Sequence, residues 1–181
     1  MYDVIKSESV ELGRFRIVLD TIRKAQRDYP YSFIDVRDSV AILAKYDNKY
    51  IFLNQYRHSI KENQLEIPGG AIDEGEQPVT AARRELSEET GYTAVNMTLL
   101  GTFYPSVGIS NEKCYLYFAE CMEKKQTRLE PLEDLSVLLL SENEIENAIL
   151  EGSLMHSMAL VAWMKYMRRL ENANKNNDPE F

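Results

Sequence analysis

The sequence lacks the features of several protein classes. Its 181 residues include only two cysteines, Cys114 and Cys121, seven positions apart in one predicted strand. An extended strand holds such positions too far apart for a disulfide, so we expect two small buried thiols in a reducing compartment. No stretch approaches the roughly 18 apolar residues of a membrane span, and the N-terminus has no signal-peptide pattern. We therefore expect a cytoplasmic protein without a membrane partner.

Positive charge is also scarce. The chain carries 21 Lys and Arg against 29 Asp and Glu, a formal net charge of −8 at pH 7. Nucleic-acid binding depends on positive surface, so nucleic acid is not an expected partner. Converging carboxylates would instead suit divalent cations. The remaining composition, 44% hydrophobic and 28% charged, is typical of one globular domain with a sizeable core.

Most of the chain has the residue pattern of strands. Residues 1–37 hold short alternating runs, of which 15–19 and 33–36 are typical of strands, with a polar, turn-like segment at 24–30 between them. Apolar runs at 39–44 and 50–53 flank a short Asp/Asn linker and predict a hairpin. Further strands are predicted at 97–103, 114–120 and 135–140.

Three segments have helical signals. Residues 78–90 begin with Pro78 and are followed by Gly91, and their apolar positions recur at helical spacing. Ser141 and Glu144 fit a capping box at the start of a short helix. Residues 153–170 predict a last, Met-rich helix packed in the core.

A glycine-rich segment precedes the first helix. Residues 67–76 contain three glycines and one proline and predict a loop of specialised backbone shape. In the helix that follows, Glu85, Glu88 and Glu89 stand at i, i+3 and i+4, so their carboxylates share one face. Arg84 alone cannot neutralise them. A solvated acidic face needs no such glycines, whereas oxygen ligands beside exposed backbone carbonyls suit Mg²⁺ or Mn²⁺. These residues predict a divalent-metal site.

The same residues resemble the Nudix box. Its single-residue positions are filled by Gly70, Glu76, Arg84-Glu85-Leu86, Glu88-Glu89 and Gly91, and Tyr92 stands where an aliphatic residue is usual. The resemblance implies an α/β Nudix fold, with a mixed β-sheet sandwiched between helices. It divides the chain into an N-terminal β extension at 1–37, a Nudix hydrolase domain at 38–170 and a disordered tail at 171–181. In the resembling branch such an extension builds a two-fold dimer and completes the neighbour's site, so we expect a homodimer.

The resemblance also implies residue roles. In similar proteins, glutamates matching Glu85 and Glu89, often with Glu88 and a backbone carbonyl matching Gly69, hold Mg²⁺, with Mn²⁺ as an alternative. Arg84 orients the glutamates. The implied activity is hydrolysis of a pyrophosphate bond, in which Glu88 and Arg84 take part in catalysis. For the general base, Glu133 aligns best, with Glu130 or a box glutamate as alternatives.

The substrate class rests on two other segments. Gln55-Tyr56-Arg57 resembles a segment of ADP-ribose and sugar-nucleotide pyrophosphatases in which the arginine contacts the phosphates. Residues 104–112 resemble a loop of the same branch. There Glu112 matches, Val107 replaces the proline usual in ADP-ribose hydrolases, and Asn111 replaces an acidic residue. The expected substrates are therefore nucleoside diphosphate sugars, ADP-ribose among them, with base and sugar unspecified.

Two other functions stay open at this point. A house-cleaning hydrolase of nucleoside triphosphates would need neither the segment 55–57 nor the N-terminal extension. A non-catalytic sensor of nucleotide sugars would usually lack box glutamates, whereas this chain has all three. The two histidines, His58 and His156, fit structural roles. The number of metal ions does not follow from the sequence.

Overall fold

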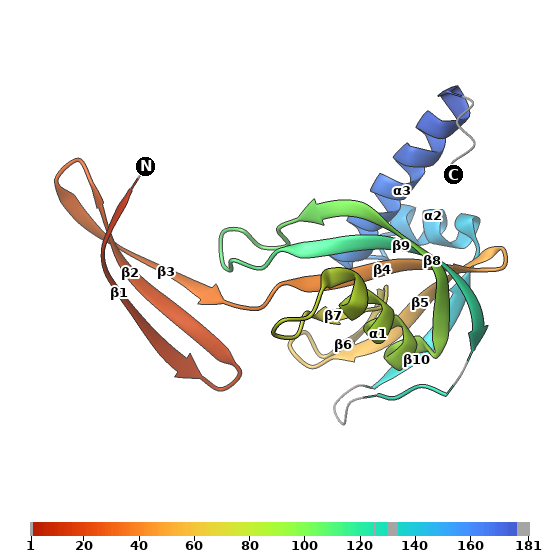
Figure 1. The fold of residues 1–181 in the computed structure, drawn as a ribbon, viewed down its shortest axis with the longest axis horizontal. Helices are drawn as coiled ribbons and strands as arrows, with labels where there is room; N and C mark the ends of the chain where they lie inside the picture. Colours follow the sequence, from red (N-terminus) through yellow and green to blue (C-terminus); the bar gives the residue numbers. More distant parts are fainter. Residues whose placement is uncertain (1, 125, 130–133, 177–181) are drawn as a thin grey trace.

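The computed structural model describes residues 2–124, 126–129 and 134–176, and within them the strands form two separate sheets. A three-stranded sheet projects from a larger body that contains a seven-stranded sheet and the helices (Figure 1). No helix in these described ranges is long and apolar enough to cross a membrane.

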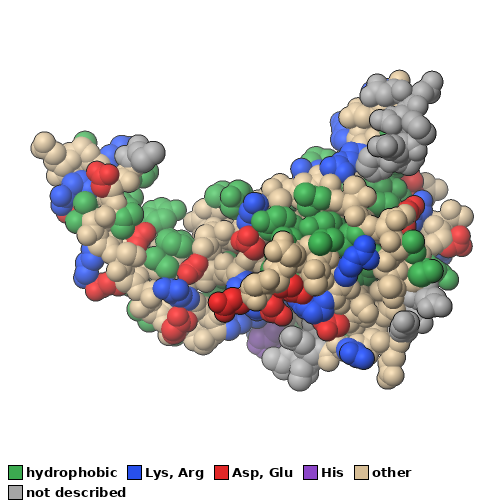
Figure 2. All heavy atoms as spheres, in the orientation of Figure 1, with side chains coloured by type: hydrophobic (Ala, Val, Ile, Leu, Met, Phe, Trp, Pro, Cys, Tyr) green, Lys and Arg blue, Asp and Glu red, His purple; other side chains and the backbone are tan. Residues whose placement is uncertain are grey.

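The projecting sheet is antiparallel, in the order β1-β2-β3, with β1 at Asp3–Leu12, β2 at Phe15–Lys24 and β3 at Arg27–Asp35. The turn predicted at 24–30 is confined to Ala25 and Gln26, both at positive φ, so the prediction there was too long. Pro30 lies inside β3, which tolerates it because an edge strand leaves one row of N–H groups unpaired. Hydrophobic and charged side chains are interspersed over the surface of the extension (Figure 2).

The larger sheet has the order β10-β5-β4-β9-β8, with β6 added to β5 and β7 added to β4. Strands β4 and β9 pair in parallel and the other pairs are antiparallel. The predicted hairpin is confirmed as β4 and β5. The strands are β4 Ser39–Tyr46, β5 Lys49–Arg57, β6 Glu62–Glu66, β7 Gly69–Ala71, β8 Tyr92–Phe103, β9 Cys114–Lys124 and β10 Leu135–Leu140.

Helices cover both faces of this sheet. Along β4, Val40 and Ile42 belong to the core cluster under α1 (Pro78–Thr90), whereas Ala41 and Leu43 belong to the cluster under α2 (Glu142–Leu150) and α3 (Ser157–Asn176). Successive residues of a strand point to opposite faces, so the two clusters are the two cores of a sandwich. The expected mixed sheet between helices is confirmed.

The last helix differs from its predicted bounds. It begins at Ser157 instead of residue 153 and continues to Asn176, so residues 171–176 of the expected tail are helical. No glycine or proline interrupts this stretch, and Arg168 pairs with Glu171 at 2.7 Å on its surface. The rest of the predicted tail, 177–181, lies outside the described residues.

The end of β3 is fastened to the loop between β8 and β9. The Asn111 side chain accepts a hydrogen bond from the Val36 N–H at 2.9 Å and donates one to Asp35 at 2.6 Å. The Ile34 N–H also donates to the Ile109 carbonyl at 2.8 Å. These bonds place the turn between β1 and β2 beside the body of the molecule.

Candidate active site

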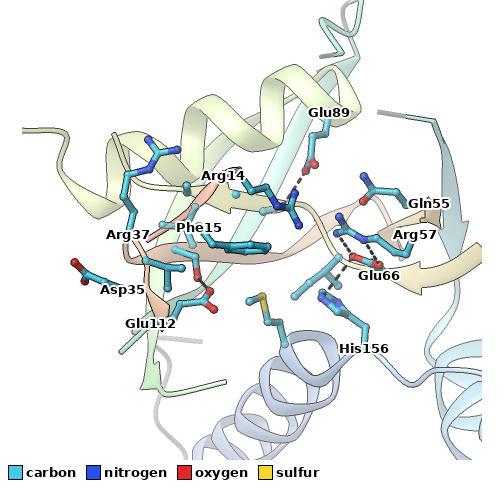
Figure 3. A pocket seen from close by; sticks show the side chains of 18 of the residues that line it. Arg14, Phe15, Asp35, Arg37, Gln55, Arg57, Glu66, Glu89, Glu112 and His156 are labelled. Carbon is cyan, nitrogen blue, oxygen red and sulfur yellow. Dashed lines mark hydrogen bonds and ion pairs between the residues drawn. The ribbon is translucent and has the colours of Figure 1, made fainter. Parts of the chain in front are cut away.

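A cavity of about 680 Å³ lies between the seven-stranded sheet, the start of α3 and the turn between β1 and β2 (Figure 3). Each of these parts contributes side chains. The lining includes Arg14, Phe15 and Arg16 from the extension, Gln55, Arg57, Glu66 and Gly69–Ala71 from the sheet, Glu89 from α1, Glu112 from the β8–β9 loop, and His156 and Met158 from the start of α3.

Two glycines allow β7 to pass between β4 and α1. A Cβ atom at Gly69 would overlap the carbonyl oxygen of Val40, and one at Gly70 would overlap the carboxylate of Glu85. The Gly69 N–H also donates to Glu89 Oε2 at 2.8 Å. The glycine segment therefore brings bare backbone against the acidic face of α1, as the sequence predicts.

Arg84 holds the acidic face of α1 together. Its Nη1 lies 2.7 Å from Glu85 Oε1 and 3.3 Å from Glu88 Oε2, while Nε and Nη2 donate to Glu76 at 3.1 and 2.9 Å. Nη2 also donates to the Ala71 carbonyl at 3.1 Å. The hydrogen bonds with Glu76 raise the pKa of Arg84 and lower the pKa of Glu76. Arg84 thus fixes carboxylates from both the loop and the helix.

The donor set on this face fits a divalent cation with few protein ligands. Within the described ranges, no three acidic, histidine or cysteine side chains converge as a closed metal cage would need. Mg²⁺ is commonly held by one or two carboxylates, with substrate phosphates and water completing its shell. Glu89 offers a carboxylate beside the backbone of Gly69, and Glu85 offers one beside Gly70. Glu89 is only 4% exposed and faces the cavity.

The structure brings three of the four expected substrate residues to the cavity. Gln55 and Arg57 line it, and Glu112 does so with its carboxylate accepting from Ser39 Oγ at 2.6 Å. Tyr56 is not among the lining residues, because neighbouring residues of a strand point in opposite directions. Its side chain is exposed.

The candidate general bases Glu133 and Glu130 lie outside the described residues. The start of their loop is placed, however, since the Arg128 N–H donates to the Glu88 carbonyl at 2.8 Å. This bond ties the loop to the C-terminal part of α1, next to the acidic face.

Several residues of the cavity were not predicted from the sequence. Glu66, 3% exposed, accepts two hydrogen bonds from Arg57, and His156 lies beside it. A charged residue within the apolar segment 65–67 was the available signal for Glu66. Arg14 and Phe15 reach the cavity from the extension, and the local sequence carries no signal for that contact.

Comparisons with known proteins agree with this architecture. The model of the NUDIX domain matches residues 35–164. An ADP-ribose pyrophosphatase of Bacillus subtilis is 38% identical over 112 residues, which cover 61% of this chain and 60% of that protein. A methanol dehydrogenase activator of Bacillus methanolicus is 33% identical over 136 residues, covering 74% of this chain and 73% of that protein.

A solved structure is similar over nearly its whole length. The crystal structure of an ADP compounds hydrolase covers 94% of this chain and 95% of its own, with a TM-score of 0.84 and 20% sequence identity. The similarity therefore extends to the projecting sheet as well as the body. At this identity it concerns the fold.

Proposed function

This chain belongs to the NUDIX family, and on that basis we propose that it hydrolyses the pyrophosphate bond of nucleoside diphosphate sugars, ADP-ribose among them. The products would be a nucleoside monophosphate and a sugar phosphate. The observation that carries the proposal is the acidic face of α1, held by Arg84, at the edge of a cavity that also contains Arg57. Relatives named ADP-ribose pyrophosphatase support the substrate class.

We propose Mg²⁺ as the cation, with Mn²⁺ as the alternative, held by Glu85, Glu89 and the carbonyl of Gly69, with Glu88 close by. NUDIX hydrolases use divalent metal ions, which when bound offset phosphate charge and lower the pKa of a bound water. The Gly69 N–H holds Glu89, and Arg84 holds Glu85 and Glu88 against their mutual repulsion. Its own contribution is therefore orientation of the ligands.

Arg57 and Gln55 are the proposed phosphate ligands. A guanidinium can bind two oxygens of a phosphate at once, and the buried Gln55 amide lies beside it (Figure 3). Glu112 is the proposed acceptor for substrate hydroxyl groups, since it lines the cavity as a carboxylate. Tyr56 is the fourth expected substrate residue. Its side chain does not line the cavity, and its role stays a prediction.

The reaction forms one bond and breaks one. The oxygen of water bonds to one phosphorus, the bond from that phosphorus to the bridging oxygen breaks, and the bridging oxygen leaves on the other phosphate. We propose Glu133 as the acceptor of the water proton, with Glu130 or a box glutamate as the alternatives. Comparison of Glu133→Gln and Glu130→Gln tests this assignment, since the base variant should lose kcat and the other should not.

We also propose that the chain forms a homodimer through residues 1–37, with residues 38–170 as the catalytic domain. The exposed side chains of the extension support this, because large apolar groups lie along it and β1 leaves an edge unpaired within the described sheet. These apolar residues include Val4, Ile5, Val10, Leu12, Leu19 and Tyr29. Sedimentation at micromolar concentration that shows only a monomer would contradict the dimer.

A cytoplasmic location is a further proposal. Cys114 and Cys121 are free thiols, and burial raises the pKa of each to about 11, so both stay protonated at neutral pH. Cys114 is buried and Cys121 partly buried, and cysteines that stay as thiols are typical of proteins in a reducing compartment.

Identification of products tests the activity. ADP-ribose, several nucleoside diphosphate sugars and nucleoside triphosphates are each incubated with Mg²⁺, with Glu89→Gln as the blank. Nucleoside monophosphate and sugar phosphate from the diphosphate sugars are the expected products. Pyrophosphate released from triphosphates alone would indicate the house-cleaning activity. Binding without turnover would indicate a sensor.

A further inference from the structure

A buried carboxylate next to the proposed phosphate ligand is shared by two side chains. Arg57 donates to Glu66 through Nε at 2.7 Å and through Nη2 at 2.6 Å. His156, which directly precedes α3, places its Nε2 atom 3.5 Å from the same Oε2 that Arg57 Nη2 contacts. Figure 3 shows the guanidinium, the carboxylate and the imidazole in sequence along one wall of the cavity.

The position of His156 is fixed by the start of α3. Its carbonyl accepts a hydrogen bond from the Leu160 N–H at 3.0 Å, which anchors its backbone. Its side chain is 19% exposed and lines the cavity, and its Nδ1 atom is buried without a hydrogen-bond partner among the described residues. Among the described residues, the imidazole therefore has one polar contact, which is the carboxylate of Glu66.

The charges around this contact favour a neutral imidazole. Burial lowers the pKa of His156, and the positive charge of Arg57 acts in the same direction, whereas Glu66 opposes them. A neutral imidazole with its proton on Nε2 can face Glu66 Oε2 without replacing Arg57. A charged imidazolium would compete with Arg57 Nη2 for that oxygen.

The orientation of Arg57 matters because recognition of phosphate by a guanidinium is directional. About half of the Arg57 side chain is exposed, and its two hydrogen bonds to the buried Glu66 restrain its orientation. A carboxylate that is also contacted by His156 at Oε2 offers the guanidinium a more fixed partner.

We propose that His156 is a positioning residue that acts through Glu66 to hold the guanidinium of Arg57 where it meets the phosphates of the substrate. The inference rests on the proposed function for the role of Arg57. The link from His156 to Arg57 can be measured without any substrate.

The first test separates KM from kcat. For His156→Leu, which fills similar space without a donor, we expect KM to rise by about threefold to tenfold, because the polar contact with the Glu66 carboxylate is lost, with kcat within about twofold. His156→Gln, which restores an N–H donor, should return KM towards the wild-type value. His58→Gln is the matched control, because His58 follows Arg57 directly in sequence but is exposed and outside the cavity lining.

The second test is the pH dependence of KM. As the pH falls through the lowered pKa of His156, the imidazolium competes with Arg57 for Glu66, so KM should rise in the wild-type protein. Within the part of the chain that the structure describes, Glu66 on β6 and Arg57 on β5 are the charged groups that act on the pKa of this imidazole. The rise should be missing in His156→Gln. A residue that only packs would leave both profiles alike.

The third test uses the Nε–H group of Arg57, observed by NMR without substrate. Its hydrogen bond to Glu66 should slow its exchange with water in the wild-type protein and in His156→Gln, and exchange should be faster in His156→Leu. Thermal unfolding checks that each variant is folded, and His156→Asn, whose amide is too short to reach Glu66, replaces His156→Leu if that variant fails. If the variant that lacks the contact with Glu66 leaves the exchange of the Arg57 Nε–H unchanged, the inference is overturned. An absence of turnover in the wild-type protein would refute the proposed function instead, and the exchange measurement would still decide the role of His156.

Discussion

Two adjacent glycines of β7 should respond differently to the same substitution. At Gly69, a new Cβ would meet fixed backbone, the carbonyl oxygen of Val40 and the Cα of Ala41. At Gly70, the nearest atoms it would meet are those of the Glu85 carboxylate, the far end of a flexible side chain. Gly69→Ala should therefore lower the stability of the fold, whereas Gly70→Ala should displace a proposed metal ligand.

The expected sizes follow from what each neighbour can do. Backbone in the middle of a sheet yields little, so Gly69→Ala should lower the free energy of unfolding by about 2–3 kcal/mol, the upper part of the range for overpacking. For a chain of this size, that is a fall in Tm of about 4–12 °C. Gly70→Ala should change the free energy of unfolding by less than about 1 kcal/mol, because the Glu85 carboxylate can rotate away. Its kcat should fall about tenfold or more.

Circular dichroism on heating and hydrolysis at saturating substrate measure the two effects. Gly108→Ala serves as the control for stability, since a Cβ there would meet open space. Equal losses of Tm at Gly69 and Gly70 would refute the distinction between backbone and side-chain neighbours. Full activity of Gly70→Ala would refute the role of Glu85 as a ligand.

Three other predictions concern single charged groups. Glu89→Gln should leave Tm nearly unchanged, because the amide oxygen can still accept the hydrogen bond from the Gly69 N–H. It should abolish turnover, because the amide lacks the negative charge that holds a cation. Full hydrolysis by this variant would contradict the role of Glu89 as a metal ligand. Arg57→Ala should raise KM far more than it lowers kcat in steady-state assays, and an unchanged KM would leave Arg57 a structural role only. The pKa of Glu76 in the folded state lies below its usual 4.5 because of its hydrogen bonds to Arg84. This interaction therefore stabilises the fold fully above pH 4.5, and the stabilisation is lost as the pH falls through the lowered pKa. Urea unfolding between about pH 5 and pH 3 should show this loss, and Glu76→Gln should lack that part of it.

The parts of the fold that the sequence predicted have local causes. The helix α1 has the predicted bounds, with Pro78 at its start and Gly91 at φ 76° after its end, a conformation that favours glycine. The capping box of Ser141 and Glu144 is present at the start of α2. The hairpin of β4 and β5 follows from apolar runs around a two-residue turn.

The parts that were missed depend on contacts between distant segments. Every residue of β1 is exposed, so no buried face imposes an apolar alternation on its sequence. The strands β6 and β7, of five and three residues, are too short to show a period and exist because they pair with β5 and β4. Such pairing is a property of the assembled sheet.

The residues of the candidate site also fall into a group with local sequence signals and a group that depends on contacts between distant segments. The glutamates of α1 and the glycines before it are neighbours in sequence, and their grouping was predictable. His156 and Glu66 are ninety positions apart, and their contact arises only when α3 packs across the sheet. The strand alternation that places Gln55 and Arg57 in the cavity also directs Tyr56 elsewhere, a distinction that the motif alone did not make.

The charges of the cavity explain how an acidic chain can bind an anionic substrate. The acidic face of α1 would repel a diphosphate, and only a bound cation could reverse that field locally. Arginines line the same cavity, from the extension and from the body, and acidic and basic side chains gather where these two parts meet (Figure 2). A diphosphate in the cavity can therefore be attracted both by the arginines and by a cation held on the carboxylates of α1. Because two of these arginines, Arg14 in the turn between β1 and β2 and Arg16 at the start of β2, come from the extension, it is part of the electrostatics of the site as well as of the proposed dimer.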